Sequence, residues 1–367
     1  FLFISKEKVN DALVKELNQD DIEIFEYGDI YAALMEIEDN QNVLVDPGNT
    51  NYRLFGSINK KCTIVERPNP AIALKAIKND IEIAHLRQTL IKDGVAVVNF
   101  LFWLEHQPDN AQITELTVAD KLYGFRKQQK LFVDNSFDPI MAYRDHSAMC
   151  HYSATRQTNR PIADKGMFLT DSGGNYLSGT TDITRTIYKG NPSKQEITDY
   201  TLVLKGHIAV ATILFPKGTR GFQVDTLSRQ YLWRQGMDFG HGTGHGVGFF
   251  LCVHEGPARI SPHPVDVSLE KGMVLTNEPG LYREGEYGIR LENMILVDKA
   301  FENEFGIFMK FENLTYCHFE RNLIDKDMLS KDEVDWVNNY HAGVFEKLSP
   351  NLDKDVSSWL KEKIKLL

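Results

Sequence analysis

The 367-residue sequence has no apolar run long enough to cross a membrane. Its longest such run, residues 95–104, is interrupted by Asn99, whereas a membrane-spanning helix needs about 20 apolar residues. A basic excess is also missing, because the formal net charge is -10 and the Lys and Arg residues are scattered. We therefore expect neither a membrane nor a nucleic-acid partner. The chain lacks an initiator methionine, so we expect residues to precede Phe1 in the full gene product.

Closely spaced cysteines are missing as well. The four cysteines, Cys62, Cys150, Cys252 and Cys317, are far apart and form no C-x-x-C pair. Such spacing indicates reduced thiols and argues against a disulfide framework or a zinc ribbon. The cytoplasm is therefore the default location.

The predicted secondary structure changes along the chain. Residues 1–75 alternate short β-rich runs with helix-period stretches, which predicts a small α/β domain. From Asn79 an amphipathic pattern predicts a long helix that ends before Pro108. A β-rich part with glycine-containing turns follows, and helical spacing returns after Phe311. A second domain is therefore expected from residue 76.

A first pair of acidic residues flanks a predicted hairpin. Asp171 and Asp182 lie on either side of a glycine-rich turn, and the midpoint between them falls between Tyr176 and Leu177. This spacing predicts that the two acids face each other across the hairpin. Facing acids are unfavourable unless a cation lies between them. The alternative is a pair of solvated turn residues.

A second pair repeats the pattern. Glu278 and Glu292 bracket a turn whose midpoint is Gly285, and the flanking residues 273–275 and 294–297 are apolar enough to be buried. Two hairpins would thus bring four carboxylates to one buried place. Such a set suggests hard divalent cations, and two of them.

A histidine and glycine motif, His241-Gly-Thr-Gly-His245, lies between the two hairpins. In an extended chain the two histidines share a face, and the glycines allow other backbone to approach closely. Alternating glycine makes a poor helix, so the motif is not the helical H-E-x-x-H of zinc proteases. One imidazole with four carboxylates carries a ligand charge of about -4, which balances two divalent cations that can acidify a bridging water.

Two further histidines, His151 and His254, have no ligand-like spacing to a neighbour. From spacing alone, each is interpreted as a hydrogen-bonded or exposed histidine without a catalytic role.

These motifs together resemble the pita-bread metallopeptidases, and specifically the cytosolic type of Xaa-Pro aminopeptidase. The resemblance extends over essentially the whole chain. Its most specific segments are Asp171-Ser172-Gly173, Gly179–Thr186, His241–Gly248, Val253–Pro257, Asn277–Gly280 and Gly288–Asn293.

The resemblance implies an α/β plus α+β architecture. Residues 1–75 would form a creatinase-like N-terminal domain, the second of two such domains in larger family members. Residues 76–310 would form the pita-bread catalytic domain with its curved antiparallel sheet, and 311–367 a C-terminal extension packed on it. A first N-terminal domain would be absent from this chain, and a homodimer is expected by family analogy.

The resemblance also implies a ligand set. Asp171 would chelate one metal, Asp182 and Glu292 would bridge two, and His245 with Glu278 would complete the other. Mn²⁺ is the usual ion in such enzymes.

By the same resemblance, His151, His241 and His254 would line the substrate site. A bridging hydroxide would attack the carbonyl of the first residue, with His254 stabilising the oxyanion and Glu278 relaying a proton to the leaving proline nitrogen.

The expected activity is hydrolysis of the bond between an N-terminal residue and a penultimate proline. A prolidase that cleaves only Xaa-Pro dipeptides is the nearest alternative. A metal-free binding scaffold on the same fold is an alternative of another class, although here all five ligand positions are filled.

Overall fold

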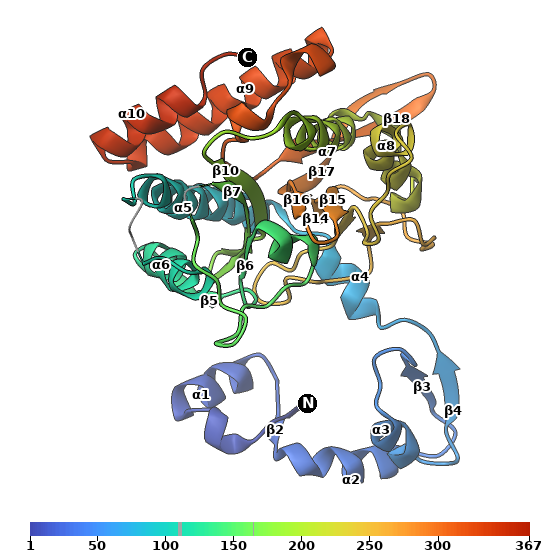
Figure 1. Ribbon diagram of the computed structural model, residues 1–367. Coiled ribbons are helices and arrows are strands. Elements are labelled where there is room, and N and C mark those ends of the chain that lie inside the picture. Colours follow the sequence, from blue (N-terminus) through green and yellow to red (C-terminus); the bar gives the residue numbers. More distant parts are fainter. Residues whose placement is uncertain (109–111, 164) are drawn as a thin grey trace. The chain divides into compact units, whose positions relative to one another are not determined.

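The computed structural model describes residues 1–108, 112–163 and 165–367. These residues divide into two compact units, Phe1–Leu74 and Lys75–Leu367 (Figure 1).

The first unit contains two pairs of parallel strands, β1 with β2 and β3 with β4. Its elements are β1 (Leu2–Phe3), α1 (Asp11–Gln19), β2 (Ile24–Phe25), α2 (Ile30–Met35), β3 (Asn42–Val45), α3 (Tyr52–Ser57) and β4 (Thr63–Glu66). Side chains that favour N-caps begin two of the helices: Asn10 accepts from the Leu13 N–H, and Asn51 from the Leu54 N–H. The predicted alternation of strands and helices is confirmed in this unit.

The second unit is mainly helices around several small antiparallel sheets. Its helices are α5 (Asp80–Glu105), α6 (Glu115–Lys127), α7 (Lys194–Thr212), α8 (Gly221–Trp233), α9 (Lys331–Leu348) and α10 (Lys354–Lys363), while the short α4 (Pro70–Ala76) crosses the boundary between the units. The long helix predicted from Asn79 is confirmed as α5. It begins with a capping box, in which Asn79 and Glu82 each bind the other's backbone N–H.

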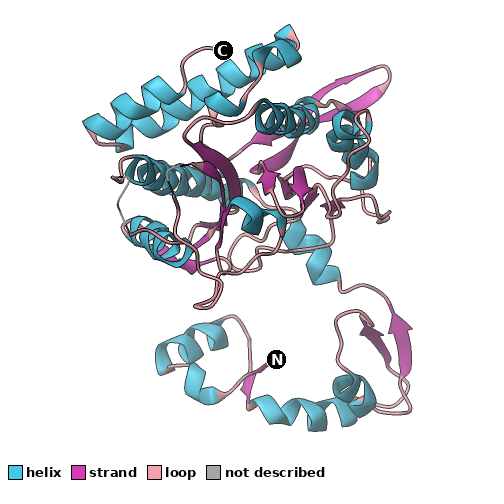
Figure 2. Cartoon of the chain, in the orientation of Figure 1, coloured by secondary structure: helices cyan, strands magenta, loops and turns pink. Residues whose placement is uncertain are grey.

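The sheets supply the strands that frame the cavity described below. One has the order β10-β7-β6, a second β5-β8-β9 and a third β11-β18-β17-β14, while β12 pairs with β13 and β15 with β16. The strands are β5 (Phe132–Asn135), β6 (Ile140–Tyr143), β7 (Gly166–Ser172), β8 (Gly174–Tyr176), β9 (Gly179–Thr180), β10 (Ile183–Lys189), β11 (Phe215–Pro216), β12 (Gly244–His245), β13 (Arg259–Ile260), β14 (Val274–Asn277), β15 (Gly280–Arg283), β16 (Tyr287–Arg290), β17 (Asn293–Asn303) and β18 (Gly306–Asn313). Figure 2 shows the curvature of the longer strands.

The first predicted hairpin forms, but its predicted register is wrong by two residues. Asp171 pairs with Thr184, not with Asp182, and the turn is the two residues between Tyr176 and Gly179. The turn comes later than predicted because Tyr176 is fully buried and its hydroxyl donates to Asp93 over 2.9 Å. The two acids are therefore offset diagonally, although their positions still share one face.

The second hairpin has the predicted centre. Gly280 pairs with Arg290 and Asn277 with Asn293, so both ladders are symmetric about Gly285, which has a φ of +74° suited to glycine. Glu278 and Glu292 lie at corresponding positions in the interval between these two ladders. The predicted centre of this hairpin at Gly285 is therefore confirmed.

The C-terminal helices α9 and α10 pack on the rest of the second unit through apolar side chains. Val344, Leu348, Val356 and Leu360 are buried in one cluster with side chains of α5. All four cysteines are free thiols, as predicted. Among the described residues, no helix combines the length and apolar character that crossing a membrane requires.

His341 of α9 provides a test of this packing through pH. It is buried, its Nε2 accepts a 3.1 Å hydrogen bond from the Phe319 N–H, and burial lowers its pKa to about 3. In the unfolded chain a histidine takes up a proton near pH 6.5, so the stability that neutral His341 contributes is lost as pH falls below that value. The His341→Gln variant keeps an acceptor and removes the titration. Between pH 7 and 5 the parent should lose about 2 kcal/mol more stability than the variant.

The measurement is urea unfolding of both metal-free proteins followed by tryptophan fluorescence, because Trp103, Trp233, Trp336 and Trp359 all lie in the second unit. Equal losses in the two proteins would contradict the prediction.

Candidate metal centre

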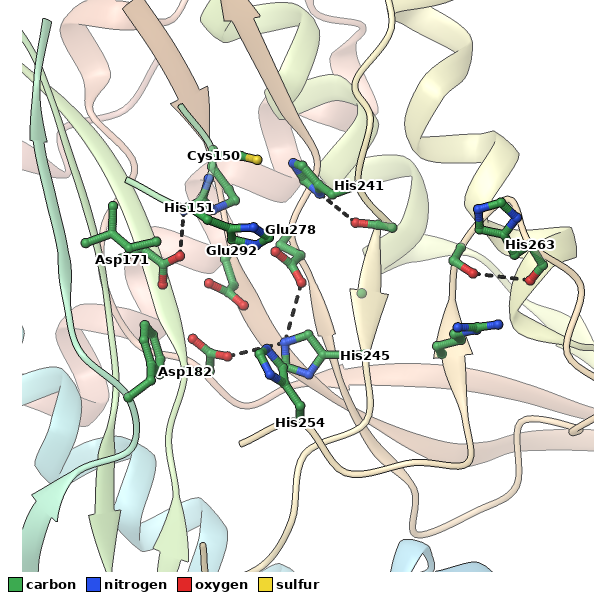
Figure 3. Close-up of a pocket in the computed structure, with 17 residues that line it drawn as sticks. Cys150, His151, Asp171, Asp182, His241, His245, His254, His263, Glu278 and Glu292 are labelled. Atoms are coloured by element: carbon green, nitrogen blue, oxygen red, sulfur yellow. Dashed lines mark hydrogen bonds and ion pairs between the residues drawn. The ribbon is translucent and has the colours of Figure 1, made fainter. Parts of the chain in front are cut away.

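One cavity of about 440 Å³ gathers the predicted site residues. The structure places all eight of them on its wall: His151, Asp171, Asp182, His241, His245, His254, Glu278 and Glu292 (Figure 3). They come from segments spread over more than a hundred residues, so only the folded chain brings them together.

Strand ends and strand breaks present the four carboxylates. Asp171 lies near the end of β7, and Asp182 directly precedes β10. Glu278 follows β14 and Glu292 precedes β17, at the two points where the long hairpin is interrupted. The Glu292 N–H donates to the Thr184 carbonyl over 3.1 Å, which fixes this break against β10. Residues at such breaks can turn their side chains towards a common centre.

Asp182, His245 and Glu292 form the tightest group, with one ligand atom of each within 4.8 Å of the others. His245 Nε2 lies 3.4 Å from Asp182 Oδ2 and 3.5 Å from Glu278 Oε1 (Figure 3). The other ring nitrogen, Nδ1, lies 3.0 Å from the Gly246 carbonyl oxygen, to which it can donate a proton. That tautomer leaves Nε2 as a lone-pair donor facing the carboxylates, which is how metal-binding imidazoles are oriented.

Two carboxylate oxygens in the group, Asp171 Oδ1 and Glu292 Oε1, are buried and have no hydrogen-bond partner within the described part of the chain. The second oxygen of each residue is occupied: Arg290 donates to Asp171 Oδ2 over 2.6 Å, and Thr184 donates to Glu292 Oε2 over 2.7 Å. Buried polar atoms without partners are costly and rare. Carboxylate oxygens and an imidazole nitrogen are ligands of divalent cations, so a bound cation would supply the partner that these two oxygens lack.

The electrostatics of the group point the same way. Burial, together with the neighbouring carboxylates Asp182 and Glu278, raises the pKa of Glu292 well above its ordinary value. Burial also raises the pKa of Asp182, against the opposing hydrogen bond from His245. Burial alone would lower the pKa of His245, but the Asp182 and Glu278 carboxylates raise it. Like charges this close retain protons unless cations replace them.

The glycines of the His241–Gly248 motif serve close backbone approach, as predicted. A β-carbon at Gly244 would collide with the Thr276 carbonyl oxygen, and one at Gly246 with the Glu255 carbonyl oxygen. Where Gly244 packs on Thr276, the His245 N–H donates a 3.0 Å hydrogen bond to Thr276 Oγ1. Larger residues would therefore displace His245.

The remaining three histidines have different surroundings. His241 Nε2 lies 2.7 Å from the Tyr282 hydroxyl, and burial lowers the pKa of His241. The ring of His254 is 4.3 Å from that of His245, and burial followed by the charge of His245 lowers the pKa of His254. His151 lines the cavity beside Cys150. Both ring nitrogens of His241 are occupied, since Nδ1 also lies 2.7 Å from the Gly242 carbonyl oxygen, whereas a neutral His254 can donate a hydrogen bond to a substrate.

Sequence reasoning missed the hydrogen-bonded pair of the buried Arg290 and the partly buried Tyr282. Arg290 Nη1 donates to the Tyr282 hydroxyl over 2.7 Å while Nη2 binds Asp171, so one chain of hydrogen bonds joins Asp171 to His241. The available signal was spacing, because Arg290 precedes Glu292 by two residues and shares its face in an extended chain.

A second arginine, Arg185, ties the site to the C-terminal segment. Its guanidinium donates to the carbonyls of Thr184, Glu292, Cys317 and His318 and to the side chains of Asn293 and Tyr340. Arg185 is almost fully buried, so these acceptors replace its water shell. The backbone of Glu292 is thereby held by residues from α9 and the segment before it.

The Tyr340→Phe variant tests this tie. In the parent, the Tyr340 hydroxyl accepts from Arg185 Nη2 over 2.9 Å and donates to the Cys317 carbonyl over 2.8 Å. Loss of this hydroxyl should lower the free energy of unfolding by about 1–3 kcal/mol. Urea unfolding measures the change. The matched control is Tyr316→Phe, since no hydrogen bond involves that hydroxyl among the described residues. Equal stability of the two variants would contradict the assigned role.

Comparison with known proteins gives the family. The description "Metallopeptidase family M24" matches residues 84–299, "Creatinase/Prolidase N-terminal domain" matches residues 1–82, and "C-terminal region of peptidase_M24" matches residues 307–367. The chain belongs to metallopeptidase family M24. Its fold is the creatinase-like domain followed by the pita-bread domain that the sequence resemblance implied.

Individual relatives agree with this assignment. Xaa-Pro aminopeptidase 1 of Dictyostelium discoideum is 40% identical over 380 residues, which cover 100% of this chain and 60% of the relative. Aminopeptidase P1 of Arabidopsis thaliana is 35% identical, covering 99% of this chain and 64% of the relative. The chain thus spans about 60% of the length of these curated relatives.

Solved structures are similar over all or most of this chain. The X-prolyl aminopeptidase of Caenorhabditis elegans, described as a cytosolic enzyme with a di-nuclear active site, has a TM-score of 0.93 and 37% identity, covering 100% of this chain and 61% of that one. The Xaa-Pro dipeptidase of Bacillus anthracis has a TM-score of 0.68 and 25% identity, covering 85% of this chain and 84% of that one.

Proposed function

We propose that this chain carries the catalytic part of a metal-dependent exopeptidase that hydrolyses the bond between an N-terminal residue and a penultimate proline. The observation that carries the proposal is a group of four carboxylates and one imidazole around one cavity. Asp171, Asp182 and Glu292 are buried, and two of their carboxylate oxygens have no hydrogen-bond partner among the described residues. The similarity to aminopeptidases named for this activity, over 99–100% of this chain in two of them, supports the substrate class.

The proposed ligand set is the one expected from the sequence. Asp171 would hold one divalent ion, Asp182 and Glu292 would bridge two, and His245 with Glu278 would hold the other. The grouping of Asp182, His245 and Glu292 supports this arrangement. Mn²⁺ is the first ion to test.

The chemistry that two such ions supply when bound is activation of a water molecule and polarisation of the scissile carbonyl. Side chains of the protein would transfer the proton, stabilise the oxyanion and contact the substrate. Glu278 accepts a 3.1 Å hydrogen bond from Thr276 Oγ1, which orients its carboxylate to take up a proton and pass it to the leaving proline nitrogen. His254, kept neutral by its lowered pKa, would donate to the oxyanion. His151 and His241 would line the substrate.

The rest of the expected organisation remains part of the proposal. It comprises a domain at residues 1–75, a catalytic domain at 76–310 and an extension at 311–367, and a homodimer in the cytoplasm. The unit boundary after Leu74 supports the first division, and the description of the C. elegans relative as cytosolic supports the location.

The Asp182→Asn variant tests the metal site. Asparagine keeps the shape but removes a bridging charge, so Mn²⁺ affinity measured by titration calorimetry should fall about 100-fold or more, since loss of even an outer partner of a ligand costs about 10–100-fold. Asp298→Asn is the control, because Asp298 lies on β17, forms an ion pair with Lys271 and is not among the residues that line the cavity. Unchanged binding of two ions by Asp182→Asn would refute the ligand assignment.

Peptide length tests the reaction. The Mn²⁺-loaded protein should release the first residue from an Xaa-Pro-Xaa peptide, measured by chromatography of the products. Cleavage of an Xaa-Pro dipeptide alone would instead identify a prolidase. Failure to bind Mn²⁺ would leave the metal-free binding scaffold as the interpretation, and binding of Mn²⁺ without cleavage of either peptide would refute the proposed activity.

A further inference from the structure

A buried lysine is paired with the loop that carries His254. Lys78, in the short connection between α4 and α5, is only 4% exposed, and lysine is almost never buried to this extent unless it is paired. Its Nζ lies 3.1 Å from Oε1 of Glu255, the residue that follows His254. The other oxygen, Oε2, lies 3.0 Å from Nζ of Lys75. Both oxygens of Glu255 are therefore bound by lysines from the connection.

Stability is a poor explanation for the pair of Lys78 and Glu255. Burial lowers the pKa of Lys78, and the Glu255 carboxylate opposes that shift. Removing two charges from water costs about as much as their attraction returns, so an apolar pair of similar volume would hold the fold equally well. The position in which the pair fixes Glu255 is a better explanation.

The loop that ends at Glu255 contains a strained turn. Leu251 and Cys252 have φ angles of +62° and +51°, in the left-handed region that residues other than glycine rarely adopt. Such residues persist only where the surrounding structure holds them. Two backbone hydrogen bonds close the loop, from the Gly248 N–H to the Cys252 carbonyl over 3.0 Å and from the Glu255 N–H to the Gly246 carbonyl over 2.8 Å. The ion pairs of Glu255 add an anchor outside the loop.

This loop determines where the ring of His254 lies. Glu255 follows His254 and is bonded to Gly246, which follows His245, so the two histidines are held side by side. Their rings are 4.3 Å apart (Figure 3). Within the described part of the chain no hydrogen bond holds the His254 ring, and the residue is exposed. Its place in the cavity therefore depends on the backbone that Glu255 anchors.

We propose that Lys78 is a positioning residue for His254, because its ion pair with Glu255 holds the strained loop in the form that points His254 at the reacting carbonyl. The inference rests on the proposed peptidase function, in which His254 donates to the oxyanion. A donor of this kind acts in the transition state more than in the bound substrate. Loss of the pair should therefore lower kcat more than it changes KM.

The kinetic test breaks the pair from either side, with Lys78→Met and with Glu255→Gln. The matched control is Lys205→Met, because Lys205 forms a largely buried ion pair with Glu333 of α9 and neither residue lines the cavity. Urea unfolding of each variant establishes that it is folded.

We expect kcat of the Mn²⁺-loaded protein on Ala-Pro-Ala to fall about tenfold or more in Lys78→Met and in Glu255→Gln, with KM within about twofold of the parent. Lys205→Met should keep the kcat of the parent, and Lys78→Arg should recover part of the loss. An equal fall in Lys205→Met, or no fall in either variant of the pair, would overturn the inference.

A double-mutant cycle separates positioning from a general loss of structure. In a His254→Ala protein, Lys78→Met should lower kcat no further, because the group that it positions is gone. The same fold-loss with and without His254 would show that Lys78 does not act through His254.

Hydrogen exchange followed by mass spectrometry tests the loop without relying on activity. The Gly248 and Glu255 amides should exchange faster in Lys78→Met than in the parent or in Lys205→Met, because their hydrogen bonds close the loop. Unchanged exchange would overturn the inference and leave the peptidase function intact. If the parent cleaves no peptide while exchange becomes faster in Lys78→Met, the proposed function fails, and only the hold of Lys78 on the loop stands.

Discussion

The repulsion among four carboxylates around one cavity, three of them buried, is the constraint on which the structure of the second unit depends. Asp171, Asp182, Glu278 and Glu292 surround a single cavity, and burial with mutual repulsion raises the pKa of Asp182 and Glu292. A protein without need of such a group would lose nothing by replacing it with apolar residues. The group is explained if divalent cations supply the missing charge.

The surrounding structure holds the carboxylates against this repulsion. The ladders on either side of Glu278 and Glu292 share one register, so the two residues face each other at breaks in the hairpin. Arg290 neutralises Asp171, and Arg185 links the Glu292 backbone to the C-terminal helices. The extension is thus a structural part of the site, although no residue of it lines the cavity.

Much of this arrangement could be predicted from spacing. Symmetry about Gly285 identified the second acid pair, and the amphipathic pattern from Asn79 identified the start of α5. The first acid pair was misregistered because the burial of Tyr176, which moves the turn, depends on tertiary contact with Asp93. The role of Arg185 could not be predicted, since its partners come from β17, α9 and the segment before α9, all distant in sequence.

The measurement that tests the central claim most directly is anomalous diffraction at the manganese absorption edge from crystals soaked in Mn²⁺. The account predicts two anomalous peaks inside the cavity, one beside Asp171 and one beside His245 and Glu278, with Asp182 and Glu292 contacting both. No peak among the four carboxylates at saturating Mn²⁺, or ions bound only at surface acids, would contradict it.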